Sequence, residues 1–194
     1  MGQSGPVFEI LFKNIIMDSI NTNQEEENHK DLSGNEGIEK LKALVKKAAV
    51  CFFCTDLHSP EGFATRPMSV QKIDASGNLW FLSAVDSNKN EQLKINNTVQ
   101  LLFQGSDYSD FLNVYGTATV SSDKQKIKQL WQPIVKTWFT EGENDPRITV
   151  IKVTPDQGYY WDTKHGAMVA LFKRLVGAAI GKTMDDSIEG NISL

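Results

Sequence analysis

Residues 62–90, GFATRPMSVQKIDASGNLWFLSAVDSNKN, decide the fold of this chain. Two apolar segments, Phe63–Ile73 and Leu79–Ser83, flank Ala75–Asn78, whose residues favour a turn, so the stretch predicts a β-hairpin. The second segment runs into a polar sequence, which predicts a short helix over Ser87–Ile95 with a serine cap. A strand that ends at the first turn of a helix meets backbone N–H groups that have no partner within the helix.

Four side chains of this stretch point to a binding site. Ser83, Ser87 and Lys89 come together where the helix dipole and the free N–H groups favour an anion. Arg66, on the first strand, adds a planar and permanently charged group. The pattern predicts a phosphate-bearing ligand, and the surrounding apolar and aromatic residues predict a ring attached to that phosphate. A plainer interpretation stays open at this point, in which Ser87 only caps the helix and Lys89 is a solvated charge.

The rest of the chain is typical of a mainly β protein that is decorated with helices. Six or seven short strands, mostly joined as hairpins, predict a small antiparallel β-barrel and not a doubly wound α/β sheet. Beyond the hairpin, the strands are expected at Ala48–Thr55, Val99–Gln104, Phe111–Val120, Arg147–Val153 and Gly158–Thr163. The helices are expected at Glu36–Lys47, from Ser122 or Asp123 to Phe139 with a kink at Pro133, and at Ala167–Ile180.

Composition excludes several classes of function. The 194 residues are 40% hydrophobic and 23% charged, which is ordinary for one globular domain. A net charge of −4 argues against a nucleic-acid-binding or anionic-membrane-binding protein, although a local basic pocket is compatible with it. The longest apolar run, Gly166–Gly181, is interrupted by Lys173 and Arg174, so we expect no membrane span.

The two cysteines and the N-terminus bear on location. Cys51 and Cys54 form a C-x-x-C pattern within an apolar strand, where residues three apart point to opposite faces, so we interpret them as core thiols. We found no secretory leader and expect a cytoplasmic protein. Met17 precedes a polar run, and we expect residues 1–16 to be dispensable. The expected organisation is a flexible extension over 1–35, one domain over 36–183 and an acidic tail over 184–194.

Other motifs carry little weight. Gly177–Thr183 (GAAIGKT) is one residue too short for a phosphate-binding P-loop and follows a helix where that motif follows a strand. It is better interpreted as a helix end capped at Gly181. There is no G-x-S-x-G nucleophile motif, and His29, His58 and His165 lack metal-ligand spacing.

The order of the segments resembles a known family. ATRPMSV, LWFLSAVDSNKNEQL, VQLLFQ, GTATV and YYWD follow one another as in the pyridoxamine 5′-phosphate oxidase-like flavin-binding split barrels, most closely the general stress proteins. The similarity spans about Gly37–Gly181, and the series is more specific than any single motif. The resemblance implies an FMN-binding split barrel, with FAD as the alternative cofactor. It also implies a homodimer whose two flavin sites are shared between subunits.

The resemblance assigns roles position by position. Arg66, Pro67 and Met68 would lie near the flavin ring or the ribityl chain. The backbone of Phe81 and Leu82 would follow the flavin edge. The remaining positions would be the phosphate contacts Ser83, Ser87 and Lys89, the flavin-contacting Gln104, and the pocket-closing Trp161, the last two from the second subunit.

Two departures from the family limit what the resemblance implies. Asn88 stands where the oxidases often carry Arg, which removes one charged hydrogen bond to the phosphate, about 1.5–3 kcal/mol. The C-terminal segment lacks the Arg and His that hold the vitamin B6 phosphate, so pyridoxamine phosphate oxidation is not expected. The alternatives are therefore an oxidoreductase of unknown substrate that uses a flavin or deazaflavin, and a non-catalytic module that stores or senses a flavin. Haem is disfavoured, since no His or Cys is placed as an axial ligand.

Overall fold

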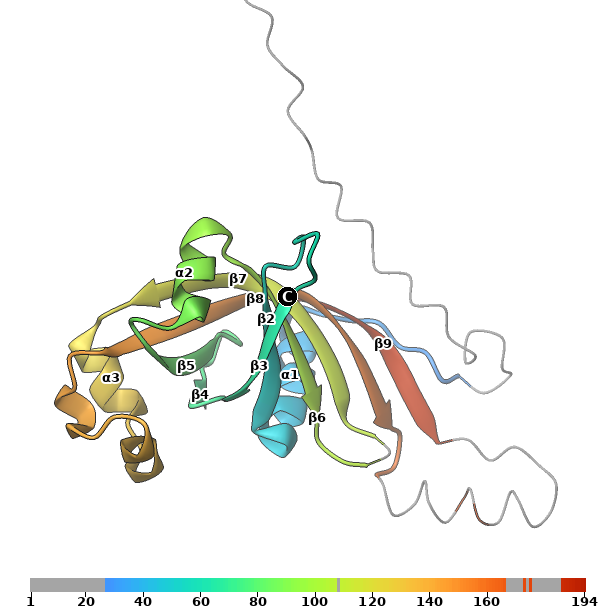
Figure 1. Ribbon diagram of the computed structural model, residues 1–194. Helices are drawn as coiled ribbons and strands as arrows, with labels where there is room; N and C mark the ends of the chain where they lie inside the picture. Colours follow the sequence, from blue (N-terminus) through green and yellow to red (C-terminus); the bar gives the residue numbers. More distant parts are fainter. Residues whose placement is uncertain (1–26, 108, 167–172, 174, 176–185) are drawn as a thin grey trace, which may run out of the picture.

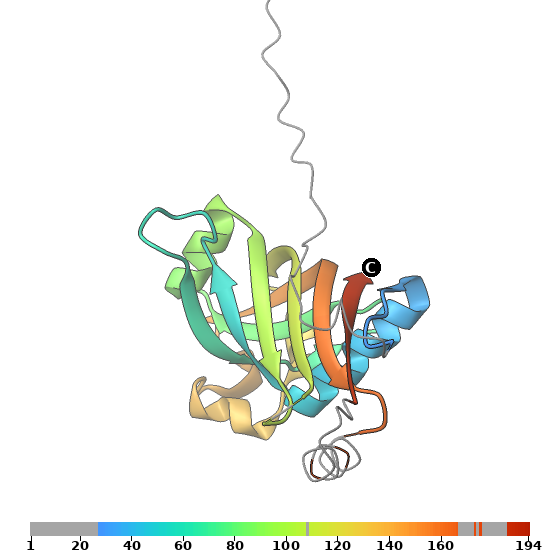
Figure 2. The ribbon, with the colours of Figure 1, turned by 90° about the vertical axis from the view of Figure 1, so that its right-hand side faces the viewer.

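In the computed structural model, which describes residues 27–107, 109–166, 173, 175 and 186–194, the chain forms one curved sheet with helices against it (Figures 1 and 2). Hydrogen bonds order the strands β1-β9-β8-β7-β6-β2-β3, and β5 joins this sheet through β8 while also pairing with β4. The mainly β fold class is confirmed. The described strands are β1 (Leu32–Ser33), β2 (Val50–Thr55), β3 (Ala64–Ser69), β4 (Lys72–Ile73), β5 (Leu79–Ala84), β6 (Thr98–Gln104), β7 (Phe111–Ser121), β8 (Ile148–Thr163) and β9 (Ser187–Ser193). The described helices are α1 (Gly34–Ala48), α2 (Asn88–Ile95), α3 (Lys124–Leu130) and the 3₁₀ segments η2 (Pro133–Thr137) and η3 (Gly142–Asn144).

The sheet divides along one edge of β8. The first part of that edge, Ile148–Val153, pairs with β5, and the later part, Gln157–Thr163, pairs with β9. The register between β7 and β8 shifts at this transition, next to Gly116. A Cβ on Gly116 would lie 2.3 Å from the carbonyl oxygen of Thr154, so only glycine lets the two strands approach this closely. One edge of a single strand therefore supports two branches of the sheet.

The expected hairpin between residues 63 and 83 was only partly right. Only β4, the end of its first arm, pairs with β5, while β3 pairs with β2 instead. The change of partner occurs at two residues: Val70 N donates to Ala49 O, and Gln71 N donates to Trp80 O. Beyond this point β3 and β5 separate, and no backbone pairing joins them among the described residues.

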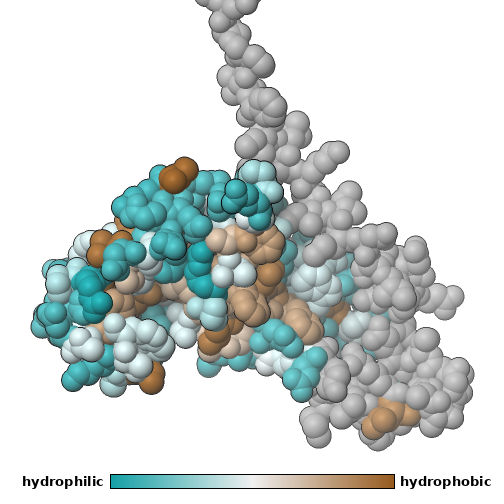
Figure 3. Space-filling model, viewed as in Figure 1, coloured by the Kyte–Doolittle hydropathy of each residue, from teal (hydrophilic) through white to brown (hydrophobic). Residues whose placement is uncertain are grey.

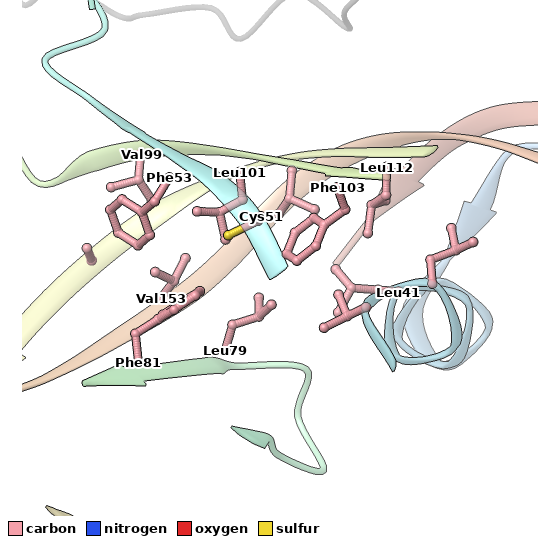
Figure 4. Close-up of a cluster of buried hydrophobic side chains, with 14 of the residues drawn as sticks. Leu41, Cys51, Phe53, Leu79, Phe81, Val99, Leu101, Phe103, Leu112 and Val153 are labelled. Atoms are coloured by element: carbon pink, nitrogen blue, oxygen red, sulfur yellow. The ribbon is translucent and has the colours of Figure 1, made fainter. Parts of the chain in front are cut away.

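The main core fills the space between β5 on one side and the β2–β3 pair, here called the β2–β3 branch, on the other. Phe53 of β2 meets Phe81 of β5 edge to face, with ring centroids 5.2 Å apart (Figure 4). Leu41 of α1 closes the core at one side (Figure 4), and all three side chains are fully buried. The expected amphipathic helix is confirmed as α1, which buries Leu41, Leu44 and Val45. Contacts across this core hold the β2–β3 branch opposite β5.

A second, smaller cluster covers the other side of β5. Ile127 and Leu130 of α3 pack with Ile148 and Val150 of β8, and Leu82 of β5 lies against them. The expected helix to Phe139 was too long, since α3 ends at Leu130 and a 3₁₀ turn starts at Pro133. Alternate residues of β5 thus enter different cores, and both faces of this short strand are covered.

The ends of the expected domain also differ from the structure. The expected flexible extension includes residues that pair with β9, since Lys30 N donates to Glu189 O and Leu32 lies opposite Ile192. The segment expected as an acidic tail forms β9, in which Ile192 is buried in the main core. The two expected strands after Arg147 are one continuous strand, β8. Residues 1–16, the helix expected at Ala167–Ile180 (apart from 173 and 175) and the Gly177–Thr183 motif lie outside the described residues.

Two further expectations concern membranes and thiols. Within the described ranges, no helix is long and apolar enough to cross a bilayer. Cys51 and Cys54 are both buried and unbonded to each other, as expected for core thiols. Burial raises the pKa of the Cys51 thiol to about 12, so it stays protonated at neutral pH.

Because Ile192 is buried against α1, Ile192→Ala should lower the free energy of unfolding by about 2–4 kcal/mol. Urea unfolding followed by circular dichroism measures this loss. Ser193→Ala, at the exposed next residue, is the matched control and should change stability by less than about 0.5 kcal/mol. Equal stabilities of the two variants would show that β9 does not contribute to the core.

Candidate functional site

The candidate site lies where β3 and β5 separate and α2 follows β5 (Figure 1). Arg66 projects from β3 toward the inner side of the sheet, because it lies opposite the core residue Phe53 in the β2–β3 register. Ser83 is the last residue but one of β5, and Ser87 caps α2 by accepting a hydrogen bond from Asn90 N. The structure therefore brings Ser83, Ser87 and Lys89 together, and Arg66 contacts α2 from β3, although β3 and β5 do not form the expected hairpin.

Lys89 is the central charge of this site. Its ammonium donates to Ser83 Oγ at 2.5 Å and to Ser87 Oγ at 3.3 Å, and the residue is only 8% exposed. An ammonium has three N–H donors, so these contacts use two of them. Among the described residues, no carboxylate lies within ion-pair distance of Lys89 or Arg66. The solvated-charge interpretation of Lys89 is therefore wrong.

Burial shifts the proton equilibrium of this lysine. Loss of hydration, with a smaller contribution from the positive charge of Arg66, lowers the pKa of Lys89 to about 8. Burial also lowers the pKa of Arg66, which stays charged at neutral pH. A bound anion would oppose both effects, because it favours the protonated lysine.

A closed set of hydrogen bonds orients Ser83. Its hydroxyl donates to Asn90 Oδ1 at 2.9 Å, and Asn90 Nδ2 donates to Thr149 Oγ1 at 2.9 Å. Thr149 in turn donates to the carbonyl oxygen of Ser83 at 3.0 Å. Because the Ser83 proton points to Asn90, its lone pairs are left for Lys89. Asn90 and Thr149 therefore fix the end of β5 and the start of α2 relative to β8.

Arg66 is held in a similar way by uncharged groups. One guanidinium nitrogen donates to Thr55 Oγ1 at 2.7 Å and another donates to Gln92 Oε1 at 3.0 Å. The Thr55 hydroxyl also donates to Gln92 Oε1, at 2.7 Å. These contacts join β2, β3 and α2 to one another.

The sequence reasoning missed Thr55, Asn90, Gln92 and Thr149. Gln92 had a weak signal, since it lies three residues after Lys89 and so on the same side of the helix. The two threonines had none, because their positions depend on strand pairing that the local sequence does not show.

The other predicted residues lie in three different places. Met68 shares the inner side of β3 with Arg66 and packs against the main core. The side chains of Phe81 and Leu82 enter the two cores, so only their backbone is available to a ligand. That backbone has β8 on one side, and no described strand pairs with the other side beyond Trp80.

Pro67, Gln104 and Trp161 lie on the opposite, outer face of the sheet. The register aligns Pro67 with Phe52, Gln104 with Phe111, and Phe111 with Trp161. These three predicted residues therefore do not join the cationic group within one chain.

The outer face carries an open apolar groove of about 340 Å³, lined by residues of β2, β3, β6 and β7 and by the last residue of α1. Phe52, 57% exposed, lies in this groove, and Figure 3 shows hydrophobic surface over β2, β3 and β6. Such a contiguous apolar surface is typical of an interaction site. The lining residues are Ala48, Val50, Cys51, Phe52, Pro67, Leu102, Phe103, Gln104 and Phe111.

Comparison with known proteins adds independent information. The family model described as pyridoxamine 5′-phosphate oxidase like matches residues 36–185. Among curated proteins, protein bli-3 of Neurospora crassa is 28% identical over 105 residues, which is 50% of this chain and 50% of that protein. The chain thus spans about half the length of the curated relative it matches.

Solved structures share the fold. A protein classed with general stress protein 26, from Jannaschia sp. CCS1, superimposes with a TM-score of 0.66 at 20% identity, covering 83% of this chain and 100% of that one. A general stress FMN/FAD-binding protein of Xanthomonas citri gives a TM-score of 0.52 at 22% identity, covering 63% and 84%. At these identities the similarity establishes the fold alone.

Lys89 imposes a measurable stability cost in the absence of ligand. Its folded pKa is below its unfolded value, so the unfolded chain binds more protons between about pH 8 and 10.5, and stability should rise with pH in that range. Lys89→Met should therefore raise the free energy of unfolding at pH 7 by about 1–3 kcal/mol, and less at pH 10.

Urea unfolding of the ligand-free protein at both pH values measures this difference. The control is Lys94→Met, on the same helix, whose ammonium is exposed and pairs with Glu91 at 2.7 Å. It should change stability by less than about 0.5 kcal/mol. If Lys89→Met were less stable than the unaltered protein at pH 7, the interpretation that the Lys89 charge is uncompensated would be wrong.

Proposed function

The chain belongs to the pyridoxamine 5′-phosphate oxidase-like family, and from this premise we propose that it is a cytoplasmic flavoprotein that binds FMN through the phosphate. The observation that carries the proposal is the buried Lys89 ammonium, which has no carboxylate partner among the described residues. A buried cation without a counter-ion is costly unless an anion completes the site. Buried free thiols at Cys51 and Cys54 fit a reducing compartment.

The charge of the site fits a phosphate monoester. Arg66 and Lys89 supply two positive charges, and the first turn of α2 adds N–H groups and the positive end of its dipole. A phosphate monoester carries nearly two negative charges at pH 7, whereas each phosphate of a dinucleotide diester carries one. This balance favours FMN over FAD.

The rest of FMN is the ribityl chain and the ring system. The inner side of β3, and the edge of β5 that pairs with no described strand beyond Trp80, suit these two parts. We place the ring system or ribityl chain near Met68, and the backbone of Phe81 and Leu82 along the flavin edge. Once bound, the flavin would supply the electron-transfer chemistry. The chain itself would hold the phosphate through Arg66 and Lys89, and would orient it through Ser83 and Ser87.

We further propose that two copies share each site. Gln104 and Trp161 lie on the face opposite the cationic group, so they can contact the same flavin only from a second copy. The apolar groove around Phe52 gives that copy a surface to bury. Flavin contacts from both chains would make dimerisation part of cofactor binding.

The proposal does not extend to pyridoxamine phosphate as substrate. The Arg and His pair with which the family's oxidases hold the substrate phosphate is absent from β9, the last strand of the described chain, which carries neither residue type. This favours flavin storage or sensing as the second candidate, and reduction of the bound flavin by nicotinamide cofactors would separate the two.

FMN binding should depend on both cations. Lys89→Met and Arg66→Met should each weaken FMN about 10- to 100-fold, which corresponds to loss of one charged hydrogen bond. Riboflavin, which lacks the phosphate, should be affected less than about threefold. Quenching of flavin fluorescence in titrations measures both affinities.

Lys94→Met is the control for this pair as well and should bind FMN as the unaltered protein does. Equal losses of FMN and riboflavin affinity would exclude the phosphate role. Absence of any flavin binding by the unaltered protein would refute the proposed function.

The shared site makes a separate prediction. Phe52→Glu puts a charge into the apolar groove, so the sedimentation mass should fall to that of one chain and FMN affinity should drop at least tenfold. Stability of the single chain should change little, since Phe52 is exposed there. Ile95→Glu, at an 89% exposed residue outside the groove, should change neither mass nor affinity. An unaltered protein that sediments as a monomer while binding FMN tightly would contradict site sharing.

A further inference from the structure

Arg66 is held differently from Arg147, the other arginine in the part of the chain that the structure describes. Arg147 donates through Nε and a terminal nitrogen to the carboxylate of Asp145, at 3.1 and 2.8 Å, so its charge is compensated. Arg66 has two neutral acceptors instead, Thr55 Oγ1 and Gln92 Oε1. Its position is thus fixed without any cancellation of its charge.

The three-way contact among Thr55, Gln92 and Arg66 is internally consistent. Thr55 is fully buried, and its single proton goes to Gln92, so its lone pairs must face Arg66. Gln92 Oε1 accepts from both partners, which fixes the orientation of its amide. A guanidinium has five N–H donors, and these contacts use two.

Gln92 also connects the two cations. It lies on α2 three residues after Lys89, while Arg66 is carried by β3. The contact between Gln92 and Arg66 therefore helps to set how far the guanidinium lies from the Lys89 ammonium. Two like charges repel, so a neutral link is needed to keep them close before an anion arrives.

From this geometry we propose that Gln92, supported by Thr55, is a positioning residue that holds Arg66 for the anionic group, and that its neutrality leaves the Arg66 charge available to a phosphate. A carboxylate at position 92 would pair with Arg66 and compete with the ligand. The inference rests on the proposed function for the identity of the ligand as a flavin phosphate. The contact network itself holds for any phosphate.

A double-mutant cycle tests the positioning role. Gln92→Met keeps the length of the side chain but removes the acceptor, and should weaken FMN about 3- to 10-fold while riboflavin changes less than twofold. In the Arg66→Met background the same substitution should have no further effect, because no guanidinium remains to be positioned. Gln92→Glu should weaken FMN more than Gln92→Met does, at least 10-fold.

The controls separate positioning from folding. Gln129→Met, at an exposed glutamine of α3, should leave both affinities unchanged, and thermal melting should show that every variant is folded. An equal loss of FMN affinity from Gln92→Met with and without Arg66 would overturn the proposal, since that pattern indicates a packing role. Equal losses for FMN and riboflavin would overturn it as well.

Inorganic phosphate distinguishes failure of this inference from failure of the proposed function. Phosphate titration followed by the backbone amide NMR signals of residues 87–90 gives the anion affinity without a flavin. If the unaltered protein binds no flavin, yet phosphate affinity depends on Gln92 only when Arg66 is present, the positioning role stands and the flavin proposal fails. If FMN binds tightly and Gln92→Met is neutral toward both FMN and phosphate, the positioning role fails alone.

Discussion

Two positively charged side chains, Lys89 on α2 and Arg66 on β3, belong to elements that are joined by a side-chain hydrogen bond, and no carboxylate among the described residues pairs with either of them. Lys89 is buried at the start of α2, and Arg66 stands on the edge strand. Like charges at short range destabilise a folded chain, and burial adds to that cost. Such an arrangement persists where a ligand of opposite charge benefits from it, and a phosphate group has the charge and the acceptor oxygens to do so.

The sheet produces this arrangement by dividing. One edge of β8 pairs first with β5 and then with β9, so β5 leaves the main sheet and faces the β2–β3 branch across the core. Packing of Phe53 against Phe81 sets the separation of the two branches at the core. The position of the site is thus a consequence of strand pairing, and its polar groups come from five different elements.

The same division explains why one chain does not form the complete site that the family resemblance implies. Successive residues of a strand point to opposite faces, so Arg66 and Pro67 cannot serve the same pocket in one copy. Gln104 and Trp161 share the outer face with the apolar groove. Neutral groups such as Gln92 and Thr55 then have a clear physical role, since they order Arg66 and leave its charge for a ligand.

The sequence by itself determined the mainly β class, the amphipathic helix α1, the serine cap of α2 and the set of residues from Arg66 to Lys89, because each of these follows from local spacing and side-chain chemistry. Only the tertiary structure decided that β3 pairs with β2 instead of forming the expected hairpin with β5, and that Ser187–Ser193 is a strand rather than a tail. It also decided that Thr55 and Gln92 hold Arg66. These features depend on which distant segments hydrogen-bond and pack together. That choice is made by the core as a whole, and a local stretch of sequence does not contain it.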